Sequence, residues 1–262
     1  MSELKQIAAA IYLAAGIGAL LGIVLPAPRM SRGAVWGLAL GALVQGLAFA
    51  TLHTVDPTPP LTHLPAAISL MAWMAVIFLL LFMWRVRLPG LAAVVGPVAF
   101  LAVFVGSLQR AGSEAASEAG GTWPHAHVLL ASAGLSLLGI ASLAGLFFLI
   151  EHRRLKAKRP VAHGLRLPSL EALDRVNLVA LAVGFPLLTL GLLTGMAWLR
   201  GMQGVLWSGT HHEIFTVVSW AIYAGLVAAR FVGHQGARQA AASAVAGFAF
   251  LLFAVVGVEL VA

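Results

Sequence analysis

The sequence contains no cysteine and has little charge. Of its 262 residues, 10% are charged, whereas a soluble domain carries about 25%. The missing thiols exclude disulfides, thiolate metal ligands and a thiol relay within this chain. The low charge excludes an ordinary soluble globule, because 61% of the residues are apolar and a bilayer is the environment that would bury so much apolar surface. We therefore expect an all-α integral membrane protein.

Long apolar runs divide the chain into eight predicted transmembrane helices. A helix needs about 20 predominantly apolar residues to cross the hydrocarbon core. Such runs cover residues 7–25, 34–53, 64–84, 91–108, 127–150, 176–199, 214–231 and 241–261. We predict a polytopic bundle of these helices, forming a single domain over residues 1–262. Glu3 and a single basic residue, Lys5, precede the first run, so we expect it to remain in the mature chain rather than act as a cleaved signal.

Glycines recur at every fourth position in three of the runs. They are Gly18 and Gly22; Gly33, Gly37 and Gly41; and Gly191 and Gly195. This spacing lets helix backbones approach closely, so we expect tight helix packing there. Pro97 and Pro186 each remove a helix hydrogen bond, and we expect bends in the fourth and sixth spans.

Lys and Arg are concentrated in alternate loops. Thirteen of the 16 basic residues lie in the loops after the first, third, fifth and seventh spans: Arg29, Arg32, Arg85, Arg87, Arg153, Arg154, Lys156, Lys158, Arg159, Arg166, Arg175, Arg230 and Arg238. The other side holds Lys5, Arg110 and Arg200. Because positive loops are retained in the cytoplasm, we predict that both termini lie outside, in a bacterium outside the inner (cytoplasmic) membrane. Membrane orientation then accounts for the net charge of +7. We expect the lipid bilayer, and no nucleic acid, as the partner of these basic residues.

Histidines gather on the predicted outer side, where this charge bias does not explain them. Six of the nine lie there: His53, His63, His125, His127, His211 and His212. Ligating residues at membrane depth are costly and usually functional. Trp123, Trp198 and Trp207 lie on the same side, and flat indole rings can stack on a planar aromatic ligand. Imidazoles beside such surfaces suit haem, whose iron takes axial His ligands.

Other interpretations of these residues stay open. Any of the tryptophans could be an interfacial anchor, and any outer histidine could have an interfacial or capping role. Glu213 is expected to cap the start of the seventh span. Zinc could bind His125 and His127, or the pair at 211–212, but the tryptophans would then have no role. Neither H-E-x-x-H nor G-x-S-x-G occurs in the chain, which argues against a protease.

Several strings in the second half of the chain carry a family signature. They are LPSLEALD at 167–174, GFPLLTLG at 184–191 and TGMAW at 194–198. With them the chain resembles the cytochrome c assembly protein family, which handles haem. The family's outer segment W-G-x-Y-W-x-W-D-P-K-E and the following W-x-x-Y helix match in register at Gly204, Trp207, Glu213, Trp220 and Tyr223. His127 resembles the family's outer histidine that opens a helix, and the resemblance is clearest over residues 124–262.

The chain also departs from the family pattern. His211 and His212 stand where the signature has Pro and Lys, and Thr210 replaces its Asp. The intramembrane histidine of the synthase branch would fall at Ala228. The pattern is most similar to the divergent, eight-span HemX-like branch.

The resemblance implies a haem-binding factor of cytochrome c biogenesis, an assembly protein rather than an enzyme. We expect haem at the outer face, its iron bound by His127 and by His211 or His212, with Trp207 and Trp123 stacking on the porphyrin and His53 as a candidate for a deeper site. The expected partners are haem, lipid, and a second assembly subunit or an apocytochrome. The alternatives are a membrane regulator of haem biosynthesis that delivers no haem, and a transporter component.

Overall fold

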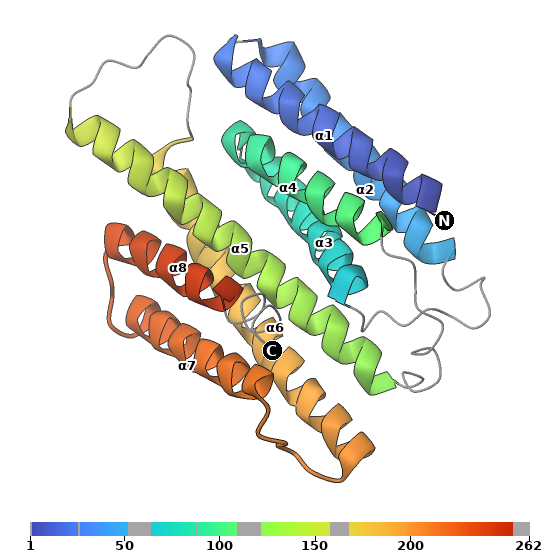
Figure 1. Cartoon of the computed structure of the whole chain (residues 1–262). Helices are drawn as coiled ribbons and strands as arrows, with labels where there is room; N and C mark the ends of the chain where they lie inside the picture. Colours follow the sequence, from blue (N-terminus) through green and yellow to red (C-terminus); the bar gives the residue numbers. More distant parts are fainter. Residues whose placement is uncertain are drawn as a thin grey trace. The chain divides into compact units, whose positions relative to one another are not determined.

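The computed structural model is all-helical in the part of the chain that it describes, residues 2–25, 27–51, 64–86, 88–108, 122–157 and 168–253. Its helices are α1 (Ser2–Val24), α2 (Pro28–Ala50), α3 (Leu64–Arg85), α4 (Pro89–Leu108), α5 (Thr122–Lys156), α6 (Leu170–Gln203), α7 (His211–Phe231) and α8 (Ala237–Leu252) (Figure 1). Helices α1 to α7 are long and apolar enough to cross a membrane, and α8 is a shorter apolar helix. The all-α prediction is confirmed. The eighth predicted span, 241–261, lies only partly within the described residues.

Two helices run well past their predicted spans. Helices α5 and α6 have 35 and 34 residues, which at 1.5 Å per residue gives about 50 Å against a hydrocarbon core of about 30 Å. The predictions of 127–150 and 176–199 were too short because hydropathy detects only the apolar part of a helix. Capping residues define the ends of α6. At the N-terminus, the Ser169 side chain accepts a hydrogen bond from the Ala172 amide. At the C-terminus, Gly204 ends the helix in the left-handed conformation, with φ 74°.

The chain forms two compact units. The first contains Met1–Val128 and Arg159–Pro168, and the second contains Leu129–Lys158 and Ser169–Ala262. Helices α1 to α4 and the first turns of α5 therefore belong to the first unit. The rest of α5 belongs to the second unit with α6, α7 and α8.

In the first unit, α1 packs against α2 and α4 at positions where glycine is required. A methyl group on Gly41 would meet the Tyr12 ring at 2.6 Å, and one on Gly37 would meet α1 at 3.0 Å. Gly22 is equally crowded, by the start of α2. The predicted close packing is confirmed at these three glycines. It is wrong at Gly33, where nothing lies within 4 Å.

A buried polar network links the first three helices. The Tyr12 hydroxyl donates to Gln45 Oε1 at 2.8 Å, and Gln45 Nε2 donates to the carbonyl oxygen and the hydroxyl of Ser69 at 2.9 and 3.1 Å. Trp73 Nε1 adds a bond from α3 to the Ala42 carbonyl at 2.7 Å. Such interhelical hydrogen bonds hold helices together where apolar burial does not discriminate between protein and lipid.

In the second unit, α6 packs against α5 through small residues. A methyl group on Gly191 would meet the Ala131 amide nitrogen at 2.8 Å, which confirms close packing at this glycine. Asn177 Nδ2 donates to the Ala141 carbonyl of α5 at 2.8 Å. Helix α8 contacts both α6 and α7, so the four helical segments of this unit share one core.

We predict that Gln45→Leu destabilises the first unit by about 1 kcal/mol, because it removes three interhelical bonds and leaves the Tyr12 hydroxyl without its acceptor. The free energy of unfolding in detergent, measured by SDS titration, checks this. Gln203→Leu, at an exposed position on α6, is the matched control. Equal effects of the two substitutions would contradict the prediction.

Candidate functional site

Residues of the sequence signature meet between α6 and α7. Trp220 Nε1 donates to Thr189 Oγ1 at 2.9 Å, and the Trp220 ring stacks on Phe185 with centroids 6.0 Å apart. Thr189 Oγ1 in turn donates to the Phe185 carbonyl at 2.9 Å. These contacts set the register of the pair, with residue 220 of α7 beside residue 189 of α6.

An ion pair joins the other end of the same two helices. Arg230 donates from one guanidinium nitrogen to Asp174 Oδ1 at 2.7 Å and from the other to the Gln235 carbonyl at 3.0 Å. The Arg230 side chain is 8% exposed, so this charge-assisted bond is screened less than a surface pair. The sequence analysis missed this pair. The only available signal was one acidic and one basic residue near adjoining span ends on the same predicted side.

The turn before α7 is held by hydrogen bonds to Glu213. Its carboxylate accepts from the amides of Ser208 and Gly209 at 2.9 and 3.0 Å and from the Ser208 hydroxyl at 2.5 Å. Thr210 is the N-cap, and its hydroxyl accepts from the Glu213 amide at 3.4 Å. The predicted capping role of Glu213 is confirmed. Gly209 has φ 77°, a backbone conformation that glycine adopts without a steric penalty.

His211 begins α7 on the side that α6 does not cover. Trp220 faces α6 through Thr189, and His211 lies nine residues before it, which is about 180° around a helix of 3.6 residues per turn. His211 is accordingly exposed. Glu213 lies seven residues before Trp220, about 20° from the line that faces α6. In the first turn of α7, the His211 imidazole and the Glu213 carboxylate therefore point to opposite sides of the helix.

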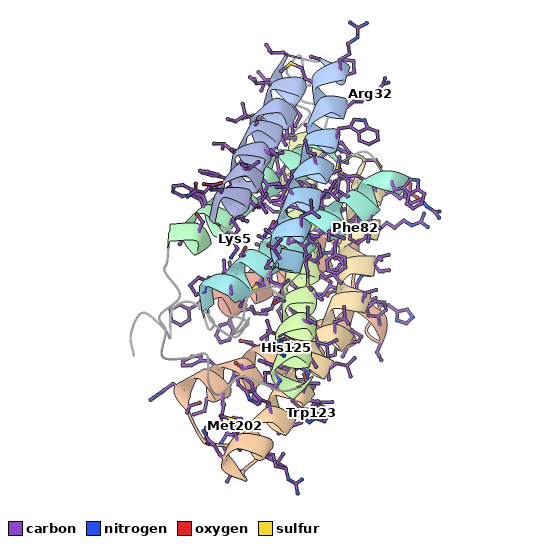
Figure 2. All side chains as sticks on the ribbon, turned by 90° about the vertical axis from the view of Figure 1, so that its right-hand side faces the viewer. Lys5, Arg32, Phe82, Trp123, His125 and Met202 are labelled. Carbon is purple, nitrogen blue, oxygen red and sulfur yellow. The ribbon has the colours of Figure 1, made fainter. Side chains whose placement is uncertain are left out.

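Tryptophan side chains are accessible close to the predicted histidines. Trp207, in the turn before α7, is 44% exposed. Trp123 and His125 lie in the first turns of α5 (Figure 2), where Trp123 is 54% exposed and His125 and His127 are half-buried. Because α5 has already begun at Thr122, two histidines two residues apart point to different sides of the helix. This arrangement argues against a zinc site made by His125 and His127 together.

The other predicted site residues are distributed as follows. His53 lies outside the described residues, and His212 follows His211 in the first turn of α7. His127 belongs to the first compact unit and His211 to the second, so their convergence on one ligand stays a prediction. Within the described ranges, no three His, Asp or Glu side chains are grouped as a metal site would group them. A structural zinc site takes four protein ligands, whereas porphyrin leaves haem iron only its axial positions.

Comparison with known proteins gives the family of the chain. The family model described as "Cytochrome C assembly protein" matches residues 61–262. The chain belongs to this family. Two relatives carry the name cytochrome c biogenesis protein CcsA. The protein from Prochlorococcus marinus is 36% identical over 102 residues, which are 37% of this chain and 32% of that protein. The protein from Microcystis aeruginosa is 34% identical over 96 residues, 36% of this chain and 29% of that protein.

Membership of the cytochrome c assembly family confirms the resemblance found in the second half of the sequence. Together with seven helices of membrane-spanning length, it establishes an integral membrane protein. The aligned region spans about a third of the length of each CcsA relative. Helices α1 and α2 precede the residues that the family model matches.

We predict that Thr189→Val destabilises the second unit by about 1 kcal/mol, because it leaves the half-buried Trp220 indole N–H without an acceptor. Thr194→Val is the matched control, since the Thr194 hydroxyl bonds only to carbonyls of its own helix. Unfolding in detergent, followed by circular dichroism, compares the two variants. A loss of the same size in both would show that the contact between α6 and α7 is not the cause.

Proposed function

We propose that this cytochrome c assembly protein binds haem at its non-cytoplasmic face and passes it on during cytochrome c biogenesis. Its family and its CcsA relatives support a role in this process. The observation that carries the proposal is the start of α7. There an exposed imidazole, His211, lies on the side of the helix away from α6, and Trp207 is accessible four residues earlier.

The donor groups in this region suit haem better than a bare metal ion. Haem iron receives four ligands from the porphyrin and needs one or two from the protein. A single histidine on an uncovered helix face can provide one of them, and an indole provides a flat surface for the ring. A bare zinc ion needs more ligands than the described residues bring together.

The proposed ligands come from two helices. His127 of α5 would provide one ligand to the haem iron, and His211 or His212 of α7 would provide the other. Helix α5 continues without interruption from His127 into the second unit, where Ala131 packs against Gly191 of α6. Two imidazoles would fill both axial positions, which suits binding and transfer rather than catalysis at the iron.

Further groups complete the proposal. Trp207 and Trp123 stack on the porphyrin, and His53 is a candidate for a deeper site. Because the chain has no cysteine, any thioether bond to haem draws its thiols from an apocytochrome. That apocytochrome or a second assembly subunit is the proposed protein partner.

We predict that the purified protein shows a Soret band in detergent, on isolation or after haem titration. His127→Ala, and the double variant His211→Ala/His212→Ala, should each weaken haem binding by at least about tenfold, because each removes a proposed ligand. His234→Ala, at an exposed position between α7 and α8, is the control and should bind like the wild type. A protein that stays colourless during titration, or variants that keep the wild-type spectrum and affinity, would refute the proposed site.

The site faces the outside only if the predicted orientation holds. Lys5 and Arg32 lie at opposite ends of the pair formed by α1 and α2 (Figure 2), as the charge asymmetry requires. The chain has no cysteine of its own, so single cysteines report topology directly.

We predict that Met202→Cys, at the exposed end of α6, reacts with a membrane-impermeant maleimide on intact cells. Ala157→Cys, at the exposed end of α5, should react only after lysis, because the positive loops are retained inside. Labelling is read by a shift in gel mobility. The opposite pattern would place the histidines of α7 in the cytoplasm.

A further inference from the structure

A carboxylate ties the turn that carries Trp207 to the first turn of α7. Glu213 accepts two backbone hydrogen bonds and one hydroxyl hydrogen bond, from Ser208 and Gly209. Ser208 directly follows Trp207, and Glu213 lies two residues after His211. The three bonds therefore close a short loop of chain that contains His211 and directly follows Trp207.

Helix capping alone does not explain this arrangement. In a capping box, the acid at the third helical position accepts from the amide of the N-cap residue itself. Here the N-cap is Thr210, whose amide also interacts with the Glu213 carboxylate, and the carboxylate reaches beyond this cap to the two preceding amides. Those amides belong to the turn and not to the helix, so the bonds stabilise the path of the turn.

The indole lies near the residue whose amide the carboxylate holds. A Cβ atom on Gly209 would lie 3.8 Å from Trp207 Nε1, and the Gly209 amide donates to Glu213 at 3.0 Å. Ser208, whose amide the carboxylate also holds, directly follows Trp207, so a movement of this turn would move the indole. In this way the position of Trp207 depends on the hydrogen bonds of Glu213.

We infer that Glu213 is a positioning residue of the haem site, which sets the Trp207 indole relative to His211. This inference rests on the proposed function and names a determinant of the same site. Glu213 and His211 are two residues apart, so their side chains point about 160° apart around the helix. Glu213 therefore acts through the turn and does not contact a ligand held by His211.

The test compares Glu213→Ala with Glu213→Gln. Alanine removes all three bonds. Glutamine keeps an oxygen that accepts from the backbone amides, and its amino group can donate to the Ser208 hydroxyl. The control is Ser169→Ala, which removes the N-cap hydrogen bond of α6, in the same unit, away from the proposed ligands in sequence.

Two measurements separate the effect of the Glu213 hydrogen bonds on the turn from their effect on haem binding. Hydrogen exchange of peptides covering residues 204–213 is recorded without haem, and we expect at least about tenfold faster exchange in Glu213→Ala. Haem titration should then show affinity lower by about 10- to 100-fold, as for other groups that orient metal ligands, with a shift of the Soret band toward the high-spin form. Glu213→Gln should recover most of both properties, and Ser169→Ala should change neither.

The outcomes are distinct. Unchanged exchange in Glu213→Ala overturns the inference, whatever haem does. Faster exchange with wild-type affinity and spectrum also overturns it, because Glu213 would then be only structural. A wild-type protein that binds no haem refutes the proposed function before any variant is compared. The exchange data still report whether the Glu213 hydrogen bonds hold the turn.

Discussion

The fold depends on one constraint: in a bilayer, the backbone polar groups must find their partners within the protein, because lipid offers none. Within a helix, the backbone groups bond to one another. The packing of one helix on the next is therefore specified by a few side chains that form hydrogen bonds to a neighbouring helix. Gln45 does this between α2 and α3, and Thr189 and Arg230 do it between α6 and α7. Glycine allows other helix pairs to approach closely: Gly41 brings α2 close to α1, and Gly191 brings α6 close to α5.

The same constraint explains why the proposed chemistry lies at the ends of helices. The polar contacts described between α6 and α7 set their register, and they leave the first turn of α7 to be held by local bonds to the preceding turn. That turn carries exposed apolar residues, including Leu206 and Trp207. Glu213 supplies order there through hydrogen bonding. An accessible imidazole and an accessible indole can therefore lie on an ordered segment, as recognition of a flat ligand requires.

The sequence predicted local features better than contacts between distant residues. Apolar runs located the helices, and Glu213 could be recognised as a cap because the amides at the start of a helix favour an acidic neighbour, whatever the distant contacts are. The bonds from Thr189 to Trp220 and from Asp174 to Arg230 join positions 31 and 56 residues apart, and they depend on a register that hydropathy does not encode. Gly33 shows the same limit, since a four-residue spacing marks a face of a helix without saying whether a neighbour covers it.

The departures from the family pattern bear on how far haem could travel along α7. The resemblance puts an intramembrane histidine of the synthase branch at Ala228, which is exposed and cannot ligate iron. Within α7, imidazoles occur only in the first turn, at His211 and His212. A second haem position deeper along this helix would therefore lack a ligand from α7. The arrangement favours one binding position at the helix end, so transfer would depend on a partner that approaches this end rather than on a relay of ligands along the helix.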